Sequence, residues 1–193
     1  PAVDHAGLRA VFESDQPLAP AAANARRDIV VFDIAQSATV LLSQPVGGAQ
    51  SNGDSSQPTL SGDGRYVAFV SSATNLDSRT TDANGAADVH VVEIGGAEAT
   101  RLDTNDAGEV IAGGGLRPDL NFDGSKLSFL SAAANVAPGA VPGQTGVFER
   151  ANPLVFQIAL VEAKSATWWV PRESGWGLFT VDQGTLVAPG WFP

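Results

Sequence analysis

The sequence predicts an all-β fold, a partial β-propeller of about three four-stranded blades followed by a short C-terminal β-segment. An Asp-Gly turn followed by an apolar, β-branched strand occurs in residues 58–72 and recurs in residues 118–131. A second stretch also recurs, since residues 28–34 (DIVVFDI) match residues 88–94 (DVHVVEI) sixty positions later. No segment keeps a helical periodicity beyond one or two turns, so little helix is expected. Repeats of about sixty residues, built from short strands, are typical of propeller blades that stack around a common axis.

Each repeat is expected to supply its strands in the same order. The first repeat begins with residues 7–14, which match residues 64–71 only weakly. It ends in a Gly/Ser/Asn-rich linker, residues 43–57. In the third repeat, residues 146–150 take the place of residues 88–92. The expected strands are 8–12, 28–34 and 39–42 in the first repeat, 65–70, 88–94 and 99–102 in the second, 127–130 and 146–150 in the third, and one more apolar candidate at 154–160.

The repeats divide the chain at residue 153. Residues 1–153 are expected to hold three propeller repeats, at about 4–57, 58–116 and 117–153, and residues 154–193 a Trp-rich C-terminal β-segment. A closed propeller uses about four to eight blades. Either the remaining blades belong to a longer chain of which this is a piece, or other chains complete the ring, or the repeats form an open arc capped by the C-terminal segment. We favour the longer chain.

The composition excludes several classes of function. The 193 residues contain no cysteine, which rules out disulfides, zinc–thiolate sites and thiol chemistry. A formal net charge of −10 disfavours nucleic acid and anionic membranes as partners, but it suits cations, above all Ca²⁺. No apolar run reaches the length of about 18 residues that a membrane-spanning helix needs, so no transmembrane segment is expected.

The best-preserved repeat carries a family resemblance. Residues 58–71 (PTLSGDGRYVAFVS) resemble the WD40-like (PD40) repeat of bacterial TolB-type β-propellers. Residues 72–76 and 82–89 are similar to a subgroup found mostly in exported bacterial proteins. The resemblance covers about residues 4–150 and is strongest in the second repeat. It implies a non-catalytic binding or scaffold module, an extracytoplasmic location (periplasmic, secreted or cell surface), and a protein or a surface polymer as partner.

All four tryptophans lie within twenty-four residues near the C-terminal end. Their segment resembles a small β-module of secreted proteobacterial proteins with a Trp-Trp-x-Pro-x-Glu-Ser-Gly-x-Gly signature. Exposed, these side chains would form a stacking platform for sugar rings or an aromatic anchor for a protein. Buried, they would form the core of a module that has little else to bury. The candidate binding residues are Trp168, Trp169, Trp176 and Trp191.

The loop before the strand expected at residues 88–94 contains the strongest candidate for a ligand site. Asp82, Asn84 and Asp88 place oxygen-bearing side chains at positions one, three and seven around Gly85, an arrangement that resembles part of a calcium loop. Asp77 would add another oxygen. The alternative is an Asx-turn that leads into the strand, with Asp88 accepting backbone hydrogen bonds. Both interpretations, a Ca²⁺ site and a structural turn, stay open.

No recognisable catalytic constellation stands out, so we do not expect an enzyme. Asp63 and Asp123 occupy matching turns, and this repetition indicates a structural role in each blade. The two histidines are His5 and His90, and His90 aligns with the strand residue Val30. No Gly-x-Ser-x-Gly nucleophile elbow occurs.

The function that these observations favour is that of a non-catalytic binding or scaffold module of an exported bacterial protein. It would act through protein–protein or surface-polymer contacts, as an accessory subunit of a larger assembly. Two alternatives stay open. One is an accessory propeller domain of a secreted hydrolase, and the other is a carbohydrate-binding module that uses the C-terminal tryptophans.

Overall fold

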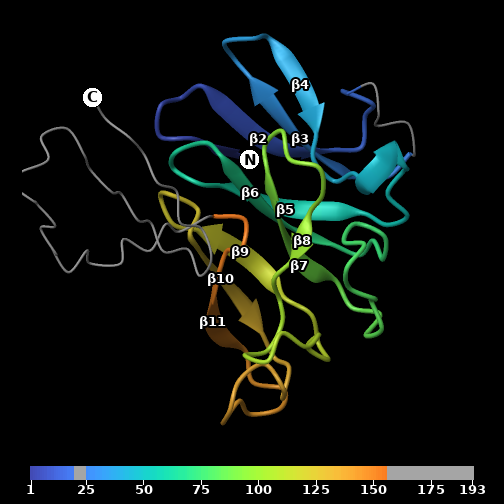
Figure 1. Ribbon diagram of the computed structural model, residues 1–193, viewed down its shortest axis with the longest axis vertical. Helices are drawn as coiled ribbons and strands as arrows, with labels where there is room; N and C mark the ends of the chain where they lie inside the picture. The colour runs from blue at the N-terminus through green and yellow to red at the C-terminus, as the bar shows by residue number, and fades with distance from the viewer. Residues whose placement is uncertain (20–24, 156–193) are drawn as a thin grey trace, which may run out of the picture. The chain divides into compact units, whose positions relative to one another are not determined.

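Three antiparallel β-sheets make up the described part of the chain (Figure 1). The computed structural model describes residues 1–19 and 25–155. Blade 1 contains β1 (Ala2–Val3), β2 (Arg9–Ser14), β3 (Asp28–Asp33) and β4 (Ala38–Leu41). Blade 2 contains β5 (Ser55–Leu60), β6 (Tyr66–Ser71), β7 (Asp88–Glu93) and β8 (Thr100–Arg101). Blade 3 contains β9 (Leu116–Leu120), β10 (Lys126–Ser131) and β11 (Gly146–Ala151), and a short 3₁₀ turn, η1 (Val46–Gly48), lies between blades 1 and 2 in the sequence.

Consecutive strands are neighbours in every blade. The orders β1-β2-β3-β4, β5-β6-β7-β8 and β9-β10-β11 are simple meanders. Equivalent strands also pair in equivalent registers, because Val30 lies opposite Leu41 in blade 1 and His90 lies opposite Arg101 in blade 2. The predicted all-β fold is confirmed, and the repeated meander is that of successive blades of a partial propeller. Within the described residues, no helix has the length and apolar character required to cross a membrane.

Blade 3 departs from the predicted four strands. Its described part has three, and the chain turns directly after β11. The Leu154 N–H donates to Oδ1 of Asn152 (3.0 Å), and the Tyr66 hydroxyl donates to the Leu154 carbonyl (3.3 Å). This Asx-turn, which has Pro153 at its centre, ends the strand at Ala151. The predicted strand 154–160 therefore begins with a turn, and its residues from 156 onward lie outside the described residues.

The predicted Asp-Gly turns form the β5–β6 and β9–β10 hairpins. Gly64 and Gly124 have positive φ angles of 72° and 70°, which glycine adopts without strain. A Cβ on Gly124 would lie 2.4 Å from Cδ2 of Tyr66, so this turn also needs glycine to accept the tyrosine ring of blade 2. The same residue therefore shapes a hairpin and the contact between two blades.

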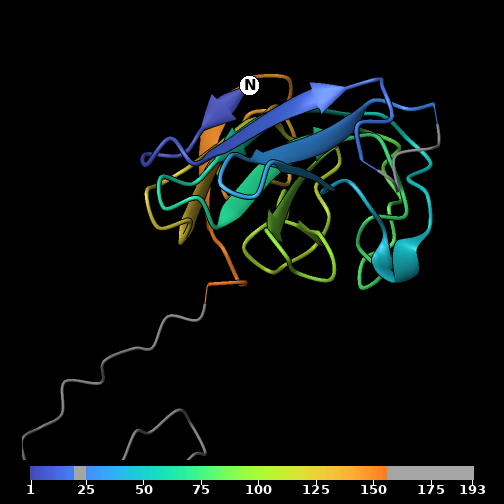
Figure 2. The same cartoon turned by 90° about the horizontal axis from the view of Figure 1, so that it is seen from above.

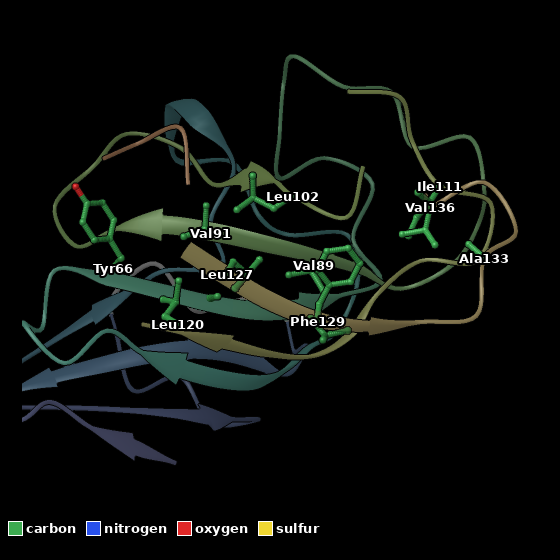
Figure 3. Packing of buried hydrophobic residues seen from close by; sticks show 12 residues of the cluster. Tyr66, Val89, Val91, Leu102, Ile111, Leu120, Leu127, Phe129, Ala133 and Val136 are labelled. Atoms are coloured by element: carbon green, nitrogen blue, oxygen red, sulfur yellow. The ribbon is translucent and has the colours of Figure 1, made fainter. Parts of the chain in front are cut away.

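Two apolar layers join the three blades. In Figure 2 the blue strands of blade 1 lie against the green strands of blade 2, and the layer between them includes Val11, Ile29, Val31, Val67, Phe69 and Leu76. The layer between blades 2 and 3, drawn in Figure 3, includes Tyr66, Val89, Val91, Leu120, Leu127 and Phe129. Blade 2 is covered on both faces, and all six residues of β6 are buried. This explains why the β6 sequence is an almost unbroken apolar run.

Candidate functional site

The structure brings the three predicted calcium ligands together, and a guanidinium group faces them. Nη2 of Arg101 donates to Oδ1 of Asp88 (2.5 Å), and Nη1 of Arg101 lies 3.6 Å from Oδ1 of Asp82. Nδ2 of Asn84 donates to the same Asp88 oxygen (3.2 Å). The positive charge that these carboxylates contact is therefore a permanently charged side chain of the protein itself.

Two more aspartates complete this group. Nε of Arg101 donates to Oδ1 of Asp103 (3.0 Å), and the Arg101 backbone N–H donates to Oδ2 of Asp77 (2.9 Å). We call Arg101 and the aspartates Asp77, Asp82, Asp88 and Asp103 the Arg101 cluster. Each of its five side chains is at most 7% exposed, so the ionic contacts are shielded from solvent. Contacts of this kind are much stronger than ion pairs on a surface, and they leave a costly buried charge when one partner is removed.

The β-sheet of blade 2 and its preceding loop position the cluster. Asp88 is the first residue of β7, Arg101 is the last residue of β8, and the pairing of these strands sets the two side chains side by side. The loop between β6 and β7 supplies Asp77 and Asp82. Nη2 of Arg79 donates to the Thr100 hydroxyl (2.6 Å), which joins the loop to β8 a second time.

Burial controls the protonation of this cluster. It raises the pKa of Asp103 to about 8, with the neighbouring Asp88 charge as the second cause and Arg101 opposing both. Burial also raises the pKa of Asp88. For Asp77, burial acts to raise the pKa, but the backbone N–H groups of Arg101 and Arg79 and the Arg79 side chain together outweigh it and lower the pKa. At neutral pH, one proton is therefore expected to reside on the Asp88–Asp103 pair.

The calcium interpretation of this loop stays a prediction. The contacts of the alternative, a structural turn, are present: Oδ1 of Asp82 accepts the Asn84 N–H (3.2 Å), and Oδ1 of Asn84 accepts the Ala86 N–H (2.8 Å). Across residues 1–19 and 25–155, no three His, Asp or Glu side chains form a group that could hold a metal ion. The acidic side chains of the loop instead converge on Arg101.

The aspartates of the repeated turns have the structural role that their repetition predicts. Oδ1 of Asp63 accepts the Ser61 hydroxyl (2.6 Å) and the Arg65 N–H (3.1 Å). Oδ1 of Asp123 accepts the Ser125 hydroxyl (2.6 Å) and the Ser125 N–H (3.0 Å). The two Ser125 hydrogen bonds lower the pKa of Asp123, because they favour its carboxylate form.

His90 occupies a buried strand position, as its alignment predicts. Its ring stacks on Phe69 with a centroid distance of 5.8 Å, and Nδ1 lies 3.3 Å from the Asp88 carbonyl oxygen. Burial, followed by the Arg101 charge, lowers the pKa of His90 to about 4, so the ring is neutral at neutral pH. His5 lies on the surface and meets the Phe122 ring edge-on. The four tryptophans proposed as binding residues lie outside the described residues.

Sequence reasoning missed the two residues that organise the site, Arg101 and Asp103. Their signal lay in the repeat, because a spacing of sixty places Arg101 on Leu41 and Asp103 on Ser43. A charged residue that replaces a leucine within a repeat indicates either an exposed position or a buried ionic contact. The acidic residues upstream, Asp82 and Asp88, would have favoured the second explanation.

Comparisons with known proteins give likenesses to β-propellers. No family model and no curated protein matches the chain. TolB from Acinetobacter baumannii is 15% identical, with a TM-score of 0.46 over 78% of this chain and 29% of that one. A TolB from Agrobacterium tumefaciens is 16% identical, with a TM-score of 0.45 over 79% of this chain and 57% of that one.

A third likeness is to the β-propeller domain of the Trilobed protease from Pyrococcus furiosus, with 13% identity and a TM-score of 0.38 over 78% of this chain and 41% of that domain. The chain thus spans well under two thirds of the length of each of these structures. The blade architecture described above rests on the sheets and registers of the chain itself.

Proposed function

We propose that this chain is a non-catalytic binding or scaffold module that acts through protein–protein contacts at the open side of blade 3. The observation that carries the proposal is a row of three aliphatic side chains, Leu116, Leu130 and Val147, on the side of blade 3 away from blade 2. They lie next to one another because Leu130 pairs with Leu116 on one side and with Val147 on the other. Val147 is 73% exposed, whereas Val89 at the equivalent position of blade 2 is fully buried.

The open edge of the sheet supports a polypeptide as the partner. In the described residues no strand pairs with the outer edge of β11, whereas β4 and β8 cover the same edge in blades 1 and 2. Such an edge offers backbone N–H and C=O groups that an added strand can bind. A surface polymer without a peptide backbone would not satisfy these groups in the same way, so we favour a protein.

The two strands that cover this edge elsewhere indicate what the partner must present. Leu42 and Leu102 directly follow β4 and β8. Leu42 donates its N–H to the carbonyl of Ile29, and Leu102 donates its N–H to the carbonyl of Val89 (2.8 Å each). Ile29 and Val89 occupy the positions in blades 1 and 2 that Val147 occupies in blade 3. Both leucines are buried in the apolar layers between blades. The partner is therefore an extended segment with an aliphatic residue opposite Val147.

An extracytoplasmic location and a bacterial source complete the proposal. They rest on the PD40-type pattern of residues 58–71 and on the exported-protein subgroup that residues 72–76 and 82–89 resemble. The acidic net charge of −10 is compatible with this assignment, since it favours solubility and disfavours polyanionic partners.

A peptide that reproduces residues 38–43 (ATVLLS) of blade 1 tests the binding surface. Added to the full chain, it is expected to slow amide hydrogen exchange in β11 and to shift the NMR signals of Val147. Val147→Lys is expected to abolish both effects, because a charged side chain on an edge opposes strand addition. The matched control is Val141→Lys, which changes an exposed valine of the β10–β11 loop and should leave binding intact.

Three outcomes would overturn the proposal. The first is the absence of binding at millimolar peptide, the second is binding that Val147→Lys leaves unchanged, and the third is a β11 edge already protected from exchange in the free chain. Co-purification from the native source then identifies the partner, and the same pair of variants shows whether that partner uses blade 3.

A further inference from the structure

A cleft opens between blades 1 and 2, and we call it the blade 1–2 cleft. Its volume is about 140 Å³, which is roughly ten times what one water molecule requires. Blade 1 lines it with β4 and the chain up to η1, including Leu42 and Gln44. Blade 2 lines it with Val92, with residues 95–97 of the β7–β8 turn, and with Glu98. The cleft therefore combines aliphatic side chains with an amide and a carboxylate.

The equivalent space between blades 2 and 3 is occupied by an arginine of the chain itself. Arg150 lies opposite Leu127 in blade 3, just as Val92 lies opposite Val67 in blade 2. Because a spacing of sixty relates Val67 to Leu127, Val92 and Arg150 occupy the same position in their blades. The Arg150 side chain crosses to blade 2, where its Nε donates to the Thr104 carbonyl (2.8 Å). Valine at position 92 is too short for such a crossing.

The contacts of Arg150 show what a guanidinium uses between two blades. Its Nη2 donates to the Val136 carbonyl (2.8 Å) and lies 3.4 Å from Oδ1 of Asp106. The guanidinium carbon lies over the Phe129 ring, 5.9 Å from its centroid. Carbonyl oxygens, a carboxylate and an apolar surface along the stem therefore hold a cation at this position.

The blade 1–2 cleft offers acceptors but no cation of its own. Oε1 of Glu98 accepts the Ser78 N–H, and among residues 1–19 and 25–155 no group donates to its Oε2. Gln44 takes the place of Thr104 at a spacing of sixty and brings an amide oxygen to the cleft. No lysine or arginine from the described part of the chain lines this cleft. Its acceptors can therefore bind a cation from another molecule.

Small residues in the β7–β8 turn keep the cleft open. Residues 95–97 are Gly-Gly-Ala, whereas the equivalent residues of blade 3 are Pro153, Leu154 and Val155. Leu154 and Val155 pack against the apolar layer between blades 2 and 3. A Cβ on Gly95 would meet no atom within 4 Å, so the chain leaves the space beside this turn empty.

We propose that the blade 1–2 cleft binds an arginine side chain of a partner polypeptide, which takes the place that Arg150 takes between blades 2 and 3. The aliphatic stem lies along Val92 and Leu42, and the guanidinium meets the carboxylate of Glu98 and the amide oxygen of Gln44. An arginine suits the site better than a lysine, because its planar fork of donors serves two acceptors at once. Anionic ligands are disfavoured by Glu98 and by the net charge of −10.

NMR of the full chain with a short arginine peptide tests the site. The blocked peptide acetyl-Gly-Arg-Gly-amide, at tens of millimolar, is expected to move the methyl signals of Val40, Leu42 and Val92 and the amide signal of Gly95. The same peptide with citrulline in place of arginine keeps the shape but is neutral. It is expected to bind about fivefold more weakly, because it loses the attraction of Glu98.

Two variants locate the binding in the cleft. Glu98→Gln keeps an acceptor for the Ser78 N–H but removes the charge, and it is expected to weaken the arginine peptide about fivefold. The matched control Glu109→Gln removes the same charge from an exposed loop residue outside the cleft and should leave the affinity unchanged. Val92→Arg gives blade 2 the side chain that blade 3 has at this position, so the cleft is filled from within and peptide binding is lost.

Three results would overturn the arginine site. They are cleft signals that do not move with the arginine peptide, equal affinities for the arginine and citrulline peptides, and a Glu98→Gln variant that binds as tightly as Glu109→Gln. If Val92→Arg does not fold, the comparison of these two glutamine variants decides the question on its own. The cleft is separate from the edge of β11, so the peptide that tests blade 3 and the arginine peptide succeed or fail independently.

Discussion

Blades 1 and 2 each bury an aspartate at the same position, but they stabilise it with different partners. Each begins its third strand with a buried aspartate, Asp28 or Asp88, and a spacing of sixty relates the two. In blade 1 the Ser43 hydroxyl donates to Asp28 (2.7 Å) and accepts the N–H of Ile29 (3.0 Å). In blade 2 the place of Ser43 is taken by Asp103, and Arg101 bridges this second carboxylate to Asp88.

The difference teaches how a neutral contact becomes an ionic network within one fold. Blade 1 has Leu41 where blade 2 has Arg101, so one substitution supplies the cation that a second carboxylate requires. The ionic version also recruits the loop aspartates Asp77 and Asp82. Blade 2 thereby couples its strands to its loop, at the expense of burying several charges.

Removing the cation alone is expected to have the largest effect. Arg101→Leu gives blade 2 the residue of blade 1 but leaves Asp82, Asp88 and Asp103 in a buried site without their guanidinium. We expect a loss of about 3–5 kcal/mol in the free energy of unfolding, measured by chemical denaturation. Arg65→Leu, which removes a solvent-exposed arginine that pairs with Glu93, serves as the control and should barely shift the midpoint. Equal losses in the two variants would contradict the role of the cluster.

Breaking the neutral contact of blade 1 is expected to cost less. Ser43→Ala removes the hydroxyl that serves both the carboxylate of Asp28 and the amide of Ile29. We expect a loss of about 1–3 kcal/mol in the free energy of unfolding, because two buried polar groups lose a partner. Ser43→Thr, which retains the hydroxyl, should recover part of this loss. If Ser43→Ala leaves the free energy of unfolding unchanged, water replaces the hydroxyl in the variant.

Converting blade 2 into blade 1 is expected to have a smaller net effect. The double variant Arg101→Leu/Asp103→Ser removes one positive and one negative group together and offers Asp88 a hydroxyl in the place that Ser43 has in blade 1. We expect stability within about 1 kcal/mol of the wild type, since apolar replacements of buried ion pairs are often neutral or favourable. A double variant as unstable as Arg101→Leu would show that Asp77 and Asp82 need the cation on their own account.

Calcium is expected to have the smallest effect, and it tests the remaining interpretation of Asp82, Asn84 and Asp88. Because Arg101 already compensates these side chains, neither Ca²⁺ nor a chelator should shift the thermal midpoint of the wild type. A rise in the midpoint with Ca²⁺ would instead support the cation site that the spacing of these residues suggests.

The blades were predictable because their strands and turns carry local signals. The run YVAFV and the Asp-Gly turns identify β6 and its hairpin without any knowledge of the partner strand. The departure in blade 3 was not predictable in this way, since residues 154–160 have the apolar content of a strand. What ends β11 is a local contact, the Asn152 side chain bound to the Leu154 N–H, which competes with strand pairing.

The candidate site was predictable only in its acidic half. Asp82, Asn84 and Asp88 lie close in sequence, so their convergence is a local property that spacing reveals. Arg101 reaches them through the β7–β8 pairing, and a register between strands cannot be derived from local spacing. The negative charge of the loop was therefore interpreted as a binding site for a metal ion, whereas the positive charge comes from Arg101, thirteen positions after Asp88.

The hairpin glycine at position 124 has a consequence for how the molecule comes apart. The ring of Tyr66 from blade 2 occupies the space that a side chain at position 124 would fill, so the hairpin of blade 3 packs directly against blade 2. Asparagine, which tolerates the same backbone conformation in ordinary turns, has a Cβ and cannot enter here. Unfolding of blade 3 must then expose the tyrosine and weaken blade 2, so these two repeats are expected to melt as one cooperative unit and not one after the other.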